Sequence, residues 1–266
     1  MAAPPALPDL DIRIEGAIAE VRLARPQARN ALSHALMTQL IEAAAFFRAS
    51  TDVQVVILTG TETYFSAGAD LADPDRVAPR TRLEQRQSVR IGPDLCAAWE
   101  ALEQVTIAAI EGYCIGGAAA LAVSLDFRIA GEGAYLRLPE IALGMNMSWG
   151  ALPRVTALVG PARAKRFAIL CEPCDADQAL AWGMIDEKSP KGGALAAARA
   201  WAAKIAALPP LPVRMTKEAI NAHANALNRA ASAMDRDQWM LTSETSDFRE
   251  GAAAFLQKRR PKFRGD

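Results

Sequence analysis

Two glycine-containing segments combine small residues in a way that lets a substrate bind to the backbone itself. Residues 64–70 read YFSAGAD and residues 112–118 read GYCIGGA, and each follows a short apolar run typical of a buried strand. A loop between a strand and a helix leaves N–H groups without a partner in either element. Two such loops from neighbouring strands can direct two donors at one oxygen, which stabilises a developing oxyanion. For either loop alone, the ordinary interpretation is a tight turn that glycine permits.

One carboxylate has apolar neighbours that would permit a role in proton transfer. Glu140 lies in the segment LPEIAL, where Leu138, Pro139, Ile141 and Leu143 flank it. Apolar surroundings raise the pKa of a carboxyl group toward neutrality, which suits a general base. The ordinary alternative for such a residue is an exposed or salt-bridged glutamate.

Short strands and helices alternate in the region that would position these groups. Residues 12–23 alternate apolar and polar side chains around Gly16 and predict a hairpin, and residues 53–58, 105–110 and 127–130 predict buried strands. Helical spacing runs from Ser33, the expected N-cap, to Ser50, and a small-residue helix is expected over 118–124. This order predicts an α/β core with parallel strands joined by right-handed crossovers.

The strand signals stop near residue 190, and the rest of the chain is helical in pattern. Apolar residues recur at helical spacing over 193–206, 212–224, 228–240 and 244–256, with a joint at Pro209-Pro210. A helical tail with little core of its own packs on the main body or on another subunit.

The composition argues against several classes of protein. Lys and Arg number 30 and so do Asp and Glu, with one basic cluster at 258–262, so we expect no nucleic-acid partner. No apolar run reaches the roughly 18 residues that a membrane span needs, and no signal-peptide pattern is present. We therefore expect a cytoplasmic protein with no membrane partner. The 4 cysteines are expected to be reduced, because a core of this size needs no disulfides.

Other kinds of site receive little support. Cys171 and Cys174 have C-x-x-C spacing, but no second pair or nearby histidine completes a zinc site, so no metal is expected. His34 and His223 fall in helical patterns and no G-x-S-x-G segment is present, which disfavours a serine hydrolase. Neither a G-x-G-x-x-G segment nor a P-loop points to NAD or ATP.

Segments with recognisable motifs cover nearly the whole chain: RPQARNAL at 25–32, FSAGAD at 65–70, EGYCIGGAAALAVSLDFRIA at 111–130, LPEIALGM at 138–145, LVGPARAKR at 158–166, DADQALAWGMID at 175–186 and FLQKRRPKF at 255–263. In this order they resemble the crotonase family, also called the enoyl-CoA hydratase/isomerase family. The resemblance implies a crotonase-like spiral of ββα units over residues 1–206, which holds an acyl-CoA site, and a helical trimerisation region over 207–266. It further implies an acyl-CoA thioester as substrate, with coenzyme A as part of the substrate and no separate cofactor, and a homotrimer or dimer of trimers.

The same resemblance implies roles for particular residues. The N–H groups of Ala67 and Gly117 would hold the thioester oxygen, and Glu140 would carry the proton. Met145, Met147 and Trp149 stand where the family often has a smaller Pro-Gly-rich loop. By their own chemistry they would form an adaptable apolar wall for a bulky or aromatic acyl group, or would pack into the trimer. The residues expected to bind substrate are Ala28, Ala69, Asp70, Leu71, Tyr113, Gly116 and Trp149.

The chain departs from the two-glutamate hydratases of the family at one position. When Gly112-Tyr113 and Gly116-Gly117 are aligned, the first glutamate falls on Ala120, whose methyl group can neither bind water nor transfer a proton. A single carboxylate at the position of Glu140 is the pattern of family members that move a double bond. Two alternatives stay open: an atypical hydratase without the first glutamate, and a non-catalytic homologue that binds acyl-CoA or serves as a scaffold.

Overall fold

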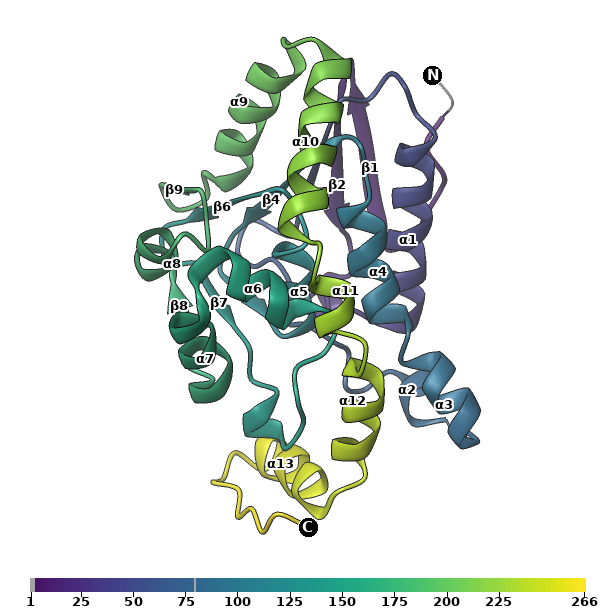
Figure 1. Cartoon of the computed structure of the whole chain (residues 1–266), viewed down its shortest axis with the longest axis vertical. Coiled ribbons are helices and arrows are strands. Elements are labelled where there is room, and N and C mark those ends of the chain that lie inside the picture. Colours follow the sequence, from purple (N-terminus) through teal and green to yellow (C-terminus); the bar gives the residue numbers. More distant parts are fainter. Residues whose placement is uncertain (1–2, 79) are drawn as a thin grey trace.

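The computed structural model describes residues 3–78 and 80–266, and in this part of the chain two β-sheets form the centre of the fold (Figure 1). The larger sheet begins with an antiparallel hairpin, and every later neighbour pairs in parallel. Its strands, in spatial order, are β1 (Leu10–Glu15), β2 (Ile18–Leu23), β3 (Val55–Thr59), β4 (Val105–Ile110), β6 (Phe127–Gly131) and β9 (Glu187–Ser189). The smaller sheet consists of β5 (Tyr113–Ile115), β7 (Tyr135–Arg137) and β8 (Cys174–Asp175).

Helices surround the larger sheet and extend past it. Figure 1 shows α9 and α10 at one end of the molecule and α12 and α13 at the other. The helices before the tail are α1 (His34–Arg48), α2 (Pro74–Val77), α3 (Arg82–Ser88), α4 (Ile91–Glu100), α5 (Gly117–Ala122), α6 (Ala151–Val159), α7 (Pro161–Leu170), α8 (Ala176–Trp182) and α9 (Ala194–Ala206). The tail contains α10 (Pro210–Ala224), α11 (Asn228–Ala231), α12 (Asp235–Ser243) and α13 (Ser246–Leu256), and two 3-10 turns are η1 (Pro26–Ala28) and η2 (Ile141–Leu143).

Both faces of the parallel strands are buried, which explains their continuous apolar sequence. Along β3, Val56 and Leu58 contribute to a core that α1, α4 and α5 complete. Val55 and Ile57 contribute to a second core on the opposite face, which α9 completes. Because β3 and β4 pair in register, with Thr59 beside Ala109, the loops that follow these two strands start at the same edge of the sheet.

The predicted α/β class is confirmed, as are the hairpin, the buried strands and the N-cap of α1, where Ser33 accepts the N–H of Leu36. Two details differ from the prediction. The glycine-containing segment 112–118, expected to form a loop, contains the strand β5, because residues 113–115 pair with β7 from later in the chain. The helix expected over 228–240 is divided into α11 and α12.

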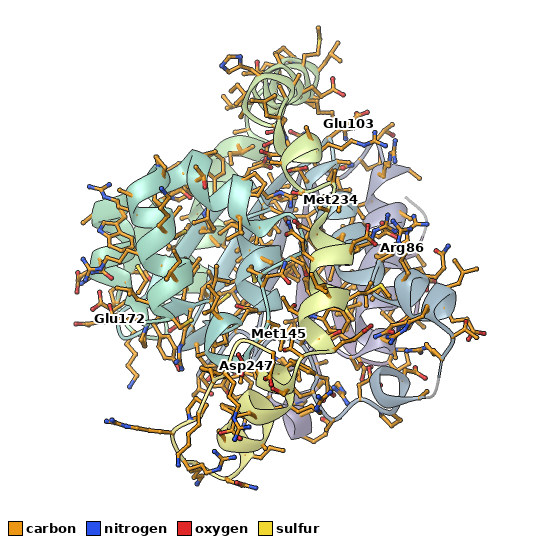
Figure 2. All side chains as sticks on the ribbon, turned by 60° about the horizontal axis from the view of Figure 1, so that its bottom comes forward. Arg86, Glu103, Met145, Glu172, Met234 and Asp247 are labelled. Carbon is orange, nitrogen blue, oxygen red and sulfur yellow. The ribbon has the colours of Figure 1, made fainter. Side chains whose placement is uncertain are left out.

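The helix α10 makes little contact with the rest of the chain. Figure 2 shows it projecting from the body next to the labelled Glu103, to which Arg214 donates at 3.1 Å. Its buried residue is Lys217, whose Nζ lies 2.7 Å from Asp126 Oδ2. Large apolar side chains on the helix are exposed, among them Leu211, Met215 and Ile220. Among the described residues, no helix is long and apolar enough to cross a bilayer.

Candidate active site

The two glycine turns lie side by side, held by backbone hydrogen bonds between them. The N–H of Phe65 donates to Tyr113 O at 3.1 Å, and the N–H of Ile115 donates to Ser66 O at 3.2 Å. The approach is so close that a Cβ atom placed on Gly68 would lie 3.5 Å from Gly117 N and 2.4 Å from Ile115 O. The sequence-based prediction that the two loops meet is therefore confirmed in geometry.

The hydrogen bonds of the first turn contradict the role predicted for Ala67. Its N–H donates to Arg29 O at 3.1 Å and is not available to a substrate. The N–H groups on either side of Ala69 are also bonded, that of Gly68 to Ser66 Oγ at 3.1 Å and that of Asp70 to Leu32 O at 3.1 Å. Within the described residues, the N–H of Ala69 is the group in 67–70 for which no acceptor is present.

The second turn presents the N–H of Gly117 at the start of α5. Gly116 is the N-cap and Gly117 is the first helical residue, so the N–H of Gly117 has no partner within the helix. The partial positive charge of the helix N-terminus adds to the attraction for an anion. The N–H of Gly116 is not available, since it donates to Arg137 O at 2.8 Å.

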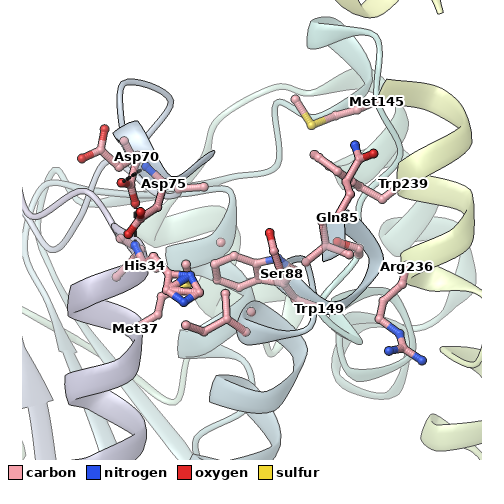
Figure 3. Close-up of a pocket in the computed structure, with 18 of the residues that line it drawn as sticks. His34, Met37, Asp70, Asp75, Gln85, Ser88, Met145, Trp149, Arg236 and Trp239 are labelled. Carbon is pink, nitrogen blue, oxygen red and sulfur yellow. Dashed lines mark hydrogen bonds between the residues drawn. The ribbon is translucent and has the colours of Figure 1, made fainter. Parts of the chain in front are cut away.

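A cavity of about 280 Å³ opens over these two donors (Figure 3). Of the residues predicted to form the site, Ala69, Asp70, Gly117, Glu140 and Trp149 line it. The structure thus brings a backbone donor from each turn, the candidate carboxylate and the candidate apolar wall to one space.

The other predicted substrate residues lie outside the cavity lining. Tyr113 stacks on Tyr64 with ring centroids 5.1 Å apart, and Leu71 is exposed. Ala28 ends the turn η1. For Ala28, Leu71, Tyr113 and Gly116, contact with the substrate stays a prediction.

Glu140 has the surroundings of a proton-transfer group. Its Oε2 is inaccessible to solvent and has no hydrogen-bond partner among the described residues. Burial raises the pKa of the carboxyl to about 7, opposed in part by its own backbone N–H and by the charge of Arg137. A carboxylate with this pKa can both take up and release a proton near neutral pH. Its Oε1 lies against the second turn, 2.7 Å from where a Cβ atom on Gly116 would stand.

The Trp149 side chain lies against α4 and α5, at Gly92 and Gly117. A Cβ atom on Gly92 would lie 2.0 Å from the indole, and a Cβ atom on Gly117 would lie 2.5 Å from it. Trp149 has φ of 63°, a left-handed conformation that is costly for a bulky residue. The Arg154 guanidinium supports this turn, because it donates to Trp149 O and Gly150 O while it pairs with Glu100. The indole therefore forms a fixed wall of the cavity.

The position of the missing first glutamate offers no replacement carboxylate from its own helix. Ala120 is fully buried and α5 consists of small and apolar residues. The other carboxylates that line the cavity lie in residues 70–75. Of these, Asp70 pairs with Arg25 at 2.6 Å, and Asp73 Oδ2 accepts the N–H of His34 at 2.6 Å.

Sequence reasoning missed the wall formed by α3 and α12. Gln85 and Ser88 from α3 and Arg236 and Trp239 from α12 line the cavity, and Figure 3 shows the α12 pair on the opposite side from Asp70. No short motif marks these residues. The apolar and polar spacing of 228–240 indicated a helix but not the surface on which it packs. Among the described residues, no group of three or more His, Cys, Asp and Glu side chains is arranged to hold a metal ion.

Known proteins resemble this chain over nearly its whole length. The family model described as enoyl-CoA hydratase/isomerase matches residues 13–266. The 2,3-dehydroadipyl-CoA hydratase of Escherichia coli (strain K12) is 35% identical over 243 residues, which are 91% of this chain and 93% of that protein. The crotonyl-CoA hydratase of Syntrophomonas wolfei is 31% identical over 250 residues, 94% of this chain and 95% of that protein.

A solved structure is similar over the same extent. An enoyl-CoA hydratase from Mycobacterium avium subsp. paratuberculosis K-10 superposes with a TM-score of 0.87 at 27% identity, covering 97% of this chain and 100% of that one. The matching model, the relatives and the shared fold all span nearly the whole sequence. The chain therefore belongs to the enoyl-CoA hydratase/isomerase family.

Proposed function

We propose that this protein binds an acyl-CoA thioester, stabilises its enolate with the N–H groups of Ala69 and Gly117, and moves a proton with Glu140. The observation that carries the proposal is that Ala69 and Gly117, whose N–H groups have no acceptor among the described residues, line a single cavity together with the buried carboxylate of Glu140. Ala69 replaces Ala67 as the first donor, because the N–H of Ala67 is bonded to Arg29 O.

The single carboxylate favours the shift of a double bond over the addition of water. In a 3-enoyl thioester, Glu140 would remove a proton from the carbon next to the carbonyl, and the negative charge would move to the thioester oxygen between the two N–H donors. The same carboxyl would return the proton two carbons further along, which gives the conjugated 2-enoyl thioester. Only a proton moves, so the reaction needs no cofactor beyond the coenzyme A of the substrate.

The side chains that line the cavity are suited to a bulky or aromatic acyl group. Met145 and Met147 are buried, and both line the cavity with Trp149. A cavity of roughly 150 Å³ accepts benzene, and this one measures about 280 Å³. Polarisable methionine side chains adapt to irregular ligands.

A second candidate is an atypical hydratase that adds water without the first glutamate. The names of the relatives favour it, because the Escherichia coli and Syntrophomonas wolfei proteins are both named hydratases. In that reaction Glu140 would have to assist both the water and the proton, since Ala120 cannot.

A substrate panel separates these candidates. We expect a 3-enoyl-CoA to gain the absorbance of a conjugated thioester, and a 2-enoyl-CoA of the same length to lose it only slowly. Fast loss of that absorbance from the 2-enoyl-CoA would favour the hydratase. Tight binding of both thioesters with no turnover would favour the non-catalytic homologue.

We also propose that residues 207–266 join chains into a trimer or a dimer of trimers. The support is the exposed apolar surface of α10, because large exposed apolar patches mark interaction sites. Light scattering should give the mass of three or six chains. Replacing Leu211 and Met215 with Asp should lower that mass, whereas a monomeric mass for the unaltered protein would contradict the proposal.

A further inference from the structure

Arg236 is a cation on the cavity wall. It lies on α12 one turn before Trp239, and residues three apart share a helix face, which is why both line the cavity. Among the described residues, Arg236 makes no hydrogen bond or ion pair, and it acts on its neighbour Asp237 only at longer range. A guanidinium in such a position can bind an anionic group of a ligand.

The carboxylates beside Arg236 are already bound elsewhere. Asp235 Oδ2 accepts the N–H of Gly150 at 2.9 Å. Asp237 accepts both Nε and Nη2 of Arg86, at 2.7 and 3.2 Å. A second pair, Arg82 with Glu244, also joins α3 to α12. These contacts hold α12 over the cavity and engage the neighbouring carboxylates, so that Arg236 has no ion pair among the described residues.

Charge is distributed unequally along the cavity. Asp70 and Asp75 lie on one side, and Figure 3 shows Trp149 between them and Arg236. Arg80 adds a second guanidinium to the lining, and its Nη1 donates to the neutral Ser88 Oγ at 3.0 Å. Since Ala69 and Gly117 would hold the thioester, an acyl chain that passes Trp149 leads toward the side with Arg236.

We propose that the acyl group carries a carboxylate at its far end, which Arg236 binds. The proposal rests on the acyl-CoA function above and specifies its substrate class. A guanidinium binds a carboxylate through two parallel hydrogen bonds and discriminates strongly against a methyl end, which would leave the cation unpaired. Gln85 and Ser88, on the α3 side of the lining, supply further polar contacts.

Equilibrium binding of saturated thioesters tests this without any turnover. Hexanoyl-CoA is compared with the six-carbon thioester that ends in a carboxylate, and the eight-carbon pair is measured in the same way. In at least one pair, we expect the thioester that ends in a carboxylate to bind about tenfold more tightly than the methyl-ended thioester of the same length. In Arg236→Met that preference should fall to within about twofold while the methyl-ended ligand binds as before, and Arg236→Lys should keep part of it.

Arg229→Met is the matched control, because Arg229 is exposed on α11 and does not line the cavity. It removes the same charge and should keep the full preference. No preference in the unaltered protein, or a preference that survives in Arg236→Met, overturns the proposal. An equal loss of affinity for both thioesters in Arg236→Met also overturns the proposal, since that result indicates a structural role for Arg236. If neither thioester binds the unaltered protein, the acyl-CoA function itself fails.

Discussion

The Glu140→Gln variant is expected to lose turnover by about 10²–10⁴-fold while its affinity for a saturated acyl-CoA stays unchanged. The amide has nearly the size of the carboxyl but cannot accept a proton from carbon. Steady-state kinetics on the active member of the substrate panel, together with equilibrium binding, checks both parts. Glu132→Gln is the control, because Glu132 is an exposed carboxyl outside the cavity lining. Undiminished turnover in Glu140→Gln would remove Glu140 from the mechanism.

The pKa of Glu140 adds a test of the same variant that does not depend on catalysis. The pKa is about 7 in the folded protein and 4.5 in the unfolded chain. Below pH 4.5 both states are protonated, and the carboxyl adds no pH dependence to folding. As the pH rises from 4.5 to 7, the unfolded chain releases the proton while the folded protein keeps it, so stability is lost. Above pH 7 the loss reaches at most roughly 3 kcal/mol.

Glutamine does not titrate, so Glu140→Gln should have a higher Tm than the unaltered protein at pH 8, and the difference should vanish near pH 4. Thermal melts across that range measure it. The kcat/KM of the unaltered protein should rise as the pH passes about 7, because the base must be ionised. A lower Tm of the variant at pH 8 would contradict the burial of an ionisable carboxyl.

The sequence predicted those parts of the site that depend on local chemistry. Glycines and small residues next to buried strands indicated both turns, and the apolar neighbours of Glu140 indicated its raised pKa. The assignment of Ala67 as the first donor is contradicted, because its N–H is bonded to Arg29 O. Which N–H stays unoccupied depends on Arg29 O, which reaches Ala67 from a distant segment and leaves Ala69 available. Such a contact is tertiary, and no local pattern contains it.

The far wall could not be predicted for the same reason. Arg236 and Trp239 belong to a helix whose own pattern is amphipathic and ordinary. Their place in the cavity follows from the pairs of α12 with α3 and from the bond of Asp235 to the N–H of Gly150. These contacts join segments from different parts of the chain. If Arg236 binds the end of the acyl group as proposed, the choice of acyl group depends on these tertiary contacts more than on the motifs that mark the family.

Gly117→Pro should lower kcat/KM by about 10²–10³-fold relative to Gly117→Ala, which tests the backbone donor itself. Proline has no N–H, and alanine keeps it. Gly117 is the first residue of α5, where proline fits because that N–H has no helical partner. Both substitutions place a Cβ atom about 2.5 Å from the end of the Trp149 ring, so both displace the indole. The two variants therefore differ in the N–H and in the proline Cδ atom, which takes the place of the amide hydrogen at the oxygen's site.

Measurements of folding and of thioester binding serve as controls for the comparison of Gly117→Pro with Gly117→Ala. Circular dichroism and Tm should be alike for the two variants, because the helix start accepts either residue, whereas the proline variant should bind a saturated acyl-CoA more weakly, since its Cδ atom occupies part of the oxygen's site. A fall in kcat beyond this loss of binding reports the interaction of the donor with the developing oxyanion. If the proline and alanine variants turn over equally, the N–H of Gly117 stabilises no enolate. The N–H of Ala69 would then be the single backbone donor to the enolate oxygen. That result would contradict the proposal that both turns donate to this oxygen.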